Sequence, residues 1–173
     1  MRPNPSLILF LLAAFSTTAA LYSINSSEDY QRTIADNVIV FPRLNAKPEA
    51  ANVLFIETGA LKLKFKQNAE SVWVAENKFK YPASSKLIQK VISQLADMRK
   101  IAVKTRMPSR FNQIGVEPYQ KADANSVFVK LQGADGEILA ESILGAQFKR
   151  NNIGVAEGTF IRHPKEQQAR LAS

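Results

Sequence analysis

The sequence predicts an α+β fold in which an antiparallel sheet, built from two three-stranded meanders, packs on one main helix of about residues 84–101. Residues 61–66 alternate apolar and lysine side chains without error, which is typical of a strand with one buried face. Residues 84–101 repeat apolar side chains at helical spacing. Asp135-Gly136, between two further alternating segments, is a strong hairpin-turn signal.

An N-terminal transmembrane or signal helix is expected to precede this fold. Residues 1–27 carry one charge, Arg2, and residues 6–15 are almost entirely apolar. The uncharged stretch is long enough to span a bilayer. A cleaved signal peptide is the alternative, because small residues follow the apolar centre at Thr18-Ala19-Ala20. The apolar character resumes at Leu21-Tyr22, which favours an uncleaved anchor.

Both interpretations of the N-terminal segment place the rest of the chain outside the cytoplasm. We therefore expect a single-pass protein of the inner membrane with its domain in the periplasm. Residues 28–50 are interpreted as a linker, in which Val38–Phe41 form a candidate edge strand stopped by Pro42. Residues 51–173 are interpreted as the α+β extracytoplasmic domain.

The first meander is expected to comprise strands at residues 52–57, 61–66 and 72–75. Trp73, the single tryptophan of the chain, is interpreted as core packing against the helix. The alternating strand is expected to bury its apolar side chains and to expose its lysines: Leu61, Leu63 and Phe65 on one side, Lys62, Lys64 and Lys66 on the other. The lysine row is either a docking stripe for phosphate or lipid headgroups, or a solubilising face that protects the sheet from unwanted pairing.

The helix is expected to begin after Ser84, whose hydroxyl can accept a hydrogen bond from the first turn. Pro82 ends the preceding extended segment. Arg99 and Lys100 would lie in the last helical turn, where cations complement the helix dipole. The stripe of residues expected to face the sheet is Leu87, Ile88, Val91, Ile92, Leu95, Met98 and Ala102.

The second meander is expected at residues 126–132, 137–144 and 158–162, with Gly145 ending its middle strand. One helical turn at residues 109–114, ended by Gly115, is expected in the connection that leads to it.

Composition excludes several chemistries. The chain of 173 residues has a net charge of +8, no cysteine and one histidine. Disulfides, thiolate zinc sites, iron–sulfur clusters and cysteine nucleophiles are therefore excluded. The seven glycines are scattered, so there is no phosphate-binding loop. His163 is interpreted as a surface or strand-end histidine. We predict no catalytic residue, no cofactor site and no metal site, and hence a protein that is not an enzyme.

A set of short motifs, taken in order, resembles a bacterial family labelled domain of unknown function 4340. The resemblance covers roughly residues 40–172. The motifs are Val40-Phe41-Pro42-Arg43-Leu44, Asn52-Val53, the strand with Trp73, Tyr81-Pro82-Ala83, Lys104-Thr105, Ile114-Gly115-Val116, Asp135-Gly136, Leu144-Gly145 and Gly158-Thr159-Phe160-Ile161-Arg162.

The resemblance implies a membrane-anchored extracytoplasmic protein with an accessory or scaffold role, often encoded near ABC-transporter components of the gliding-motility type. It carries over no catalytic residue. Ser84 stands where the family often has an acidic cap. The chain ends at Ser173, whereas many relatives continue into a further similar segment, so a short member and a fragment are both open interpretations.

Two functions follow as hypotheses. The first is an accessory or scaffold module that binds a membrane-protein partner, with an ABC-type membrane complex as the candidate. The alternative is an envelope module that binds anionic lipid or another polyanion through Lys62, Lys64 and Lys66. Nucleic acid is not expected as a partner, because the lysine row lacks the interleaved aromatic side chains that single strands stack on. No small-molecule substrate is identified.

Overall fold

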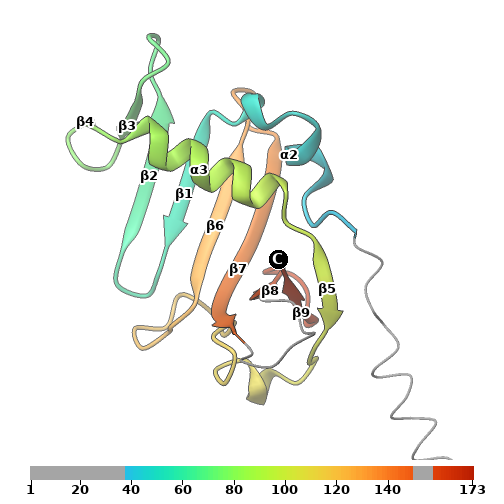
Figure 1. Ribbon diagram of the computed structural model, residues 1–173. Helices are drawn as coiled ribbons and strands as arrows, with labels where there is room; N and C mark the ends of the chain where they lie inside the picture. The colour runs from blue at the N-terminus through green and yellow to red at the C-terminus, as the bar shows by residue number, and fades with distance from the viewer. Residues whose placement is uncertain (1–37, 150–157) are drawn as a thin grey trace, which may run out of the picture. The chain divides into compact units, whose positions relative to one another are not determined.

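The computed structural model describes residues 38–149 and 158–173, and a nine-stranded antiparallel sheet dominates them (Figure 1). Neighbouring strands follow the order β4-β3-β2-β1-β6-β7-β8-β9-β5. The predicted α+β class with an antiparallel sheet is confirmed. The predicted N-terminal membrane helix lies outside the described residues.

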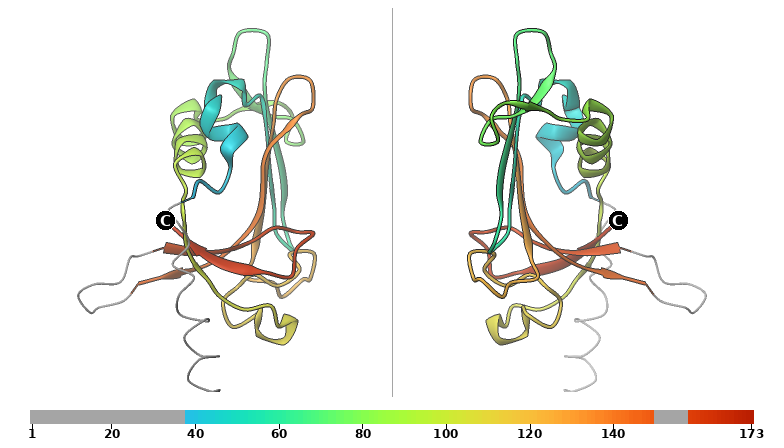
Figure 2. Two further views of the ribbon diagram at one scale, coloured as in Figure 1. Left: turned by 90° about the vertical axis from the view of Figure 1, so that its right-hand side faces the viewer. Right: turned by 90° about the vertical axis from the view of Figure 1, so that its left-hand side faces the viewer.

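Both predicted meanders are present, and they join through pairing of β1 with β6. The first comprises β1 (Val53–Glu57), β2 (Lys62–Gln67) and β3 (Trp73–Ala75), with the two-residue strand β4 (Tyr81–Pro82) at the sheet edge. The second comprises β6 (Val127–Gln132), β7 (Ile138–Phe148) and β8 (Gly158–Arg162), followed by β9 (Ala169–Ala172). Figure 2 shows that the sheet bends, so that β8 and β9 run across the direction of β1 and β6.

The main helix is shorter than predicted. Helix α3 spans Ser85–Ala96, and the Ser84 hydroxyl accepts a hydrogen bond from the Leu87 N–H at 3.4 Å, as expected for the cap. The chain then forms strand β5 (Lys100–Val103) at the sheet edge. The prediction of helix up to residue 101 was wrong because β9 offers this segment a partner, and a strand of four residues is too short to show its own periodicity.

Helix α3 crosses one face of the sheet over β2, β1, β6 and β7 (Figure 1). Its buried side is centred on Ile88, Ile92 and Leu95. Leu87 was predicted to be buried, but it is 65% exposed because it lies outside this stripe. Trp73 is fully buried in the same cluster as Ile88 and Ile92, as predicted.

The segment before β1 belongs to the packed domain. The edge strand predicted at Val38–Phe41 is reduced to one isolated antiparallel bridge, between Ile39 and Arg99. The short helix α2 (Pro42–Ala46) and the 3₁₀ turn η1 (Pro48–Ala50) follow, and the Leu44 side chain is fully buried. The described residues before β1 are therefore packed together with the sheet.

The other face of the sheet is covered at one end by the connection between β5 and β6, which contains the 3₁₀ turn η2 (Pro108–Arg110). A second apolar cluster forms there from Phe111, Val116, Phe128, Ile143 and Ala169. Arg162 is buried beside it. Its Nε donates to the Val116 carbonyl at 2.9 Å, and its guanidinium lies 4.8 Å from the centre of the Phe111 ring. Burial lowers the pKa of Arg162 from its ordinary value.

Candidate functional site

The predicted lysine row lies on the sheet face opposite α3. Phe65 packs against the helix-side cluster, and strand alternation turns Lys62, Lys64 and Lys66 to the other face. The apolar side of β2 is less buried than predicted, since Leu61 precedes the strand and is 43% exposed. Leu61 lies in the turn between β1 and β2 and is not among the residues packed on the helix-side cluster, whereas Phe65 is.

Two lysines of the row carry acidic partners. Lys62 Nζ lies 4.0 Å from Glu57 Oε2, and Lys64 Nζ lies 2.5 Å from Glu76 Oε2. The hydrogen bond from Lys64 is the main cause that lowers the pKa of the Glu76 carboxyl. The row is therefore less available to an external anion than three unpaired lysines would be.

An aromatic ring lies under the row. Lys64 Nζ is 5.6 Å and Lys130 Nζ is 4.4 Å from the centre of the Phe55 ring. Both distances fall within the range of cation–π attraction, which holds each ammonium over the apolar ring. Lys64 and Lys130 on this face therefore already interact with a side chain of the sheet itself.

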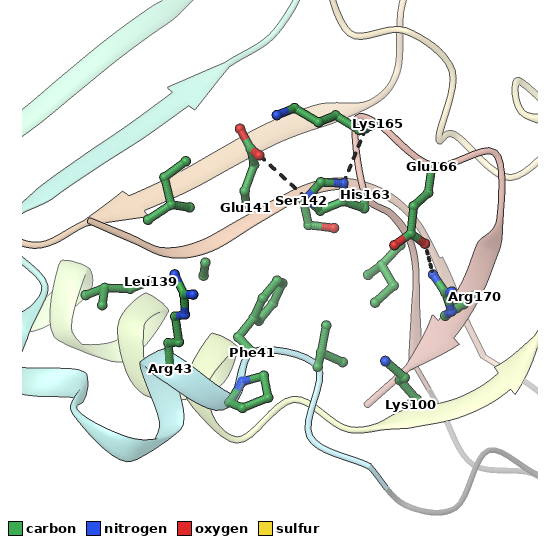
Figure 3. A pocket seen from close by; sticks show the side chains of 15 residues that line it. Phe41, Arg43, Lys100, Leu139, Glu141, Ser142, His163, Lys165, Glu166 and Arg170 are labelled. Atoms are coloured by element: carbon green, nitrogen blue, oxygen red, sulfur yellow. Dashed lines mark hydrogen bonds and ion pairs between the residues drawn. The ribbon is translucent and has the colours of Figure 1, made fainter. Parts of the chain in front are cut away.

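A groove of about 540 Å³ lies on another part of the molecule, and sequence reasoning did not find it (Figure 3). Its walls come from the segment that enters α2, from β7 and from the β8–β9 hairpin. The residues that line it are Val40, Phe41, Pro42, Arg43, Lys100, Ile138, Leu139, Ala140, Glu141, Ser142, Ile161, His163, Lys165, Glu166 and Arg170.

The floor of the groove is apolar. Phe41, Leu139 and Ile161 line it and are buried in the core. Ser142 is also buried, and its hydroxyl lies 3.3 Å from the backbone oxygens of both Ile143 and Arg162. The hydroxyl donates its proton to backbone carbonyls and not to a catalytic base. Ser142 is therefore a poor candidate for a nucleophile.

The rim of the groove is charged, with a cationic surplus. Four cationic side chains line it, Arg43, Lys100, Lys165 and Arg170, against two acidic ones, Glu141 and Glu166. Arg170 Nη1 donates to Glu166 Oε2 at 2.7 Å, and this hydrogen bond is the main cause that lowers the pKa of the Glu166 carboxyl.

His163 lies on this rim beside Glu141. Its Nδ1 accepts a hydrogen bond from the Lys165 N–H at 3.3 Å, so the proton of a neutral imidazole must be on Nε2. Nε2 lies 3.6 Å from Glu141 Oε2. The β7–β8 pairing, which sets Ile143 opposite Arg162, brings these two side chains together. His163 was predicted at a strand end, and it follows the last residue of β8.

The arrangement is suited to binding. An apolar floor under a net positive rim can hold an apolar chain that carries an acidic group, since both parts of such a ligand find a matching surface. The described residues include no cluster of three or more acidic, histidine or cysteine side chains able to hold a metal ion. Within the same residues, no helix is long and apolar enough to cross a membrane.

Comparison of the chain with models of protein families, with curated proteins and with solved structures finds no match. The resemblance to the domain of unknown function 4340 stays a prediction.

Proposed function

We propose that the chain is a membrane-anchored extracytoplasmic accessory module of the inner membrane, and that its groove binds a segment of a protein partner. The groove is the observation that supports this proposal, because it combines an apolar floor with four cationic side chains against two acidic ones. The resemblance to family 4340 directs the proposal toward an ABC-type membrane complex as the partner.

The partner segment has a defined chemistry. Phe41, Leu139 and Ile161 would contact an aliphatic side chain, and the surplus cations Lys100 and Lys165 would pair with a carboxylate. The groove volume lies within the range of pockets that enclose small ligands, so it accommodates one or two side chains of an extended segment.

The position of the groove in the sequence suits a partner in the membrane. Its first lining residue, Val40, follows residues 1–27, the proposed anchor, by one short connector. A domain tethered by such a connector stays close to the bilayer, so its groove meets membrane proteins at a raised effective concentration.

Site-directed cross-linking tests this function. Because the chain has no cysteine, a single introduced cysteine can carry one photo-cross-linker. Ile138→Cys places it on the groove, and Leu61→Cys places it away from the groove. The two positions are equally accessible, since Ile138 is 42% and Leu61 is 43% exposed. In native membranes, the label at position 138 should capture one defined membrane protein, and mass spectrometry should identify a subunit of an ABC-type complex.

Charge variants provide the control. Adding Lys165→Glu to the position-138 variant should abolish capture, because the reversed charge repels a carboxylate in the groove. Lys90→Glu, an equal change on the exposed side of α3, should leave it intact. Identical capture from positions 138 and 61, or capture that survives Lys165→Glu, would contradict the proposal.

A further inference from the structure

The loop between β3 and β4, residues 76–80, presents an aromatic side chain at its tip. Phe79 is fully exposed to solvent. The Tyr81 N–H donates to the Lys78 carbonyl at 3.0 Å, so residues 78–81 form a hydrogen-bonded turn. Its central residues, Phe79 and Lys80, have φ values of 53° and 55°.

This turn has a sequence that stability does not explain. Hairpin turns with positive φ at both central positions strongly favour Asn-Gly or Gly-Gly, because other side chains are strained there. Phe79 bears that strain and packs against nothing in return, since its side chain is fully exposed. Strain that brings no packing gain is typical of positions selected for contact with something outside the chain.

The loop is held firmly on the edge of β2. The Glu76 N–H donates to the Lys64 carbonyl at 2.8 Å. The Asn77 side chain accepts from the Lys64 N–H at 3.1 Å and donates to the Lys62 carbonyl at 2.5 Å. These bonds extend the β2 ladder, so the Phe79 turn stands on a rigid support.

Lysines are frequent in this loop and in the strand beside it. Lys78 and Lys80 flank it in sequence and are exposed, and the adjacent strand β2 contributes Lys62, Lys64 and Lys66. Figure 2 shows the loop projecting on the side of the sheet away from α3, which is the face that carries the lysine row. Glu57 and Glu76 pair with two of the β2 lysines, Lys62 and Lys64. Lys66 remains on β2, and Lys78 and Lys80 are the two cations next to Phe79 in the loop itself.

We propose that this surface, Phe79 with Lys78 and Lys80, docks on an anionic lipid bilayer. A protruding aromatic ring enters the headgroup region, where amphipathic and aromatic side chains are favoured. The flanking lysines pair with anionic headgroups at the bilayer surface. Protein interfaces are depleted in lysine relative to other surfaces, so an exposed ring flanked by two lysines fits a bilayer better than a second protein.

A fluorescent label at position 79 tests the proposal in the full-length chain. Phe79→Cys provides a single thiol for an environment-sensitive dye, and Met107→Cys, 56% exposed in the β5–β6 connection, provides the matched control. With preformed phosphatidylglycerol-containing vesicles, the emission of the dye at position 79 should shift to the blue and rise severalfold. High salt should reverse this shift because it screens the lysines, and the dye at position 107 should not respond.

Lysine variants identify the source of the response. Lys78→Gln with Lys80→Gln should remove the shift at position 79, whereas Lys86→Gln with Lys90→Gln, two exposed lysines on α3, should retain it. The absence of a shift with anionic vesicles, or an equal shift with pure phosphatidylcholine vesicles, overturns the proposal. The same shift with soluble polyphosphate and no vesicles also overturns it, because the ligand would then be a polyanion in solution. The dye reports position 79 alone, so failure here leaves the groove proposal untouched.

Discussion

At the scale of single residues, the left-handed backbone conformation of Phe79 should lower the stability of the protein. A left-handed conformation costs a non-glycine residue about 1–2 kcal/mol. A glycine at the same position avoids this cost, but its greater conformational freedom in the unfolded chain lowers stability by about 0.5–1 kcal/mol. Because Phe79 buries no surface, Phe79→Gly should raise the free energy of unfolding by about 0.5–1 kcal/mol. Urea denaturation followed by circular dichroism measures this change.

Lys78 is the matched control at this scale, since its φ is not among the positive ones of the described residues. Lys78→Gly should lower the free energy of unfolding by about 0.5–1 kcal/mol. Changes of the same sign at positions 78 and 79 would show that strain at Phe79 does not decide the outcome.

At the scale of elements, Gly145 shows why the predicted end of β7 was wrong. Glycine in a strand pattern marks either an end or a close approach of another backbone. Here β7 continues to Phe148, and a Cβ on Gly145 would collide with the Ile114 carbonyl and lie 2.8 Å from the Gly115 carbonyl. The β5–β6 connection packs directly on β7 at this glycine, and the Ala146 N–H donates to the Ile114 carbonyl at 3.0 Å.

Gly145→Ala should therefore displace that connection and lower the free energy of unfolding by about 2–3 kcal/mol, as overpacking of a close contact does. Gly136 provides the control, because nothing lies within 4 Å of a Cβ there and its φ is +85°. Gly136→Asn should cost less than about 1 kcal/mol, since asparagine tolerates this conformation. If chemical denaturation gives the same decrease in the free energy of unfolding for both variants, the close contact at Gly145 does not determine stability.

Which elements the sequence could predict depended on their length and on their partners. Strands β2 and β6, one in each meander, have six residues each with an alternating pattern, and the Asp135-Gly136 turn has Gly136 at positive φ, so local patterns were sufficient there. Strands β5 and β9 have four residues each and gain their identity from pairing with each other. Helix α2 has only five residues, which is too few to show a helical periodicity. The burial of its Leu44 in the core therefore could not be predicted from the sequence.

The groove could not be predicted for a related reason. Its lining comes from segments as far apart as residues 40–43 and 161–170. Long-range pairing brings them together, through the bonds of residues 38–40 to residues 98–100 and through the strand order of the sheet. His163 stood out in the sequence, but its partner Glu141 is fixed by the β7–β8 register. The lysine row was visible from alternation, whereas the glutamates that pair with it come from β1 and from the loop after β3.

At the scale of the whole molecule, carboxyl and phenol groups define the pH range of stability. The pKa values of Glu76 and Glu166 are lowered, each mainly by a hydrogen bond from a cationic partner. A lowered pKa contributes stability above the ordinary value, about 4.3 for glutamate, and this contribution is lost as the pH falls through the lowered value. Burial raises the pKa of Tyr119, so its contribution is lost when the pH rises beyond about 10.

We therefore expect the free energy of unfolding to fall on both sides of neutral pH. A double-mutant cycle of Glu166→Gln and Arg170→Gln isolates one contribution on the acid side. Because Glu166 is half exposed, the coupling energy at pH 7 should be about 0.2–1 kcal/mol, and it should vanish below the pKa of the carboxyl. Coupling that persists when the carboxyl is protonated would assign the interaction to packing instead of charge.

Helix α3 connects β4 to β5, and these two strands stand at opposite ends of the strand order. The partner of β5, strand β9, follows it by about seventy residues, a long separation for a contact that must form late. During synthesis, the backbone groups of β5 that pair with β9 must therefore stay without this partner until the intervening residues have emerged. That delay exposes a nascent-chain edge to aggregation and to chaperones. A substitution that prolongs it would reduce the yield of a protein whose finished stability is unchanged.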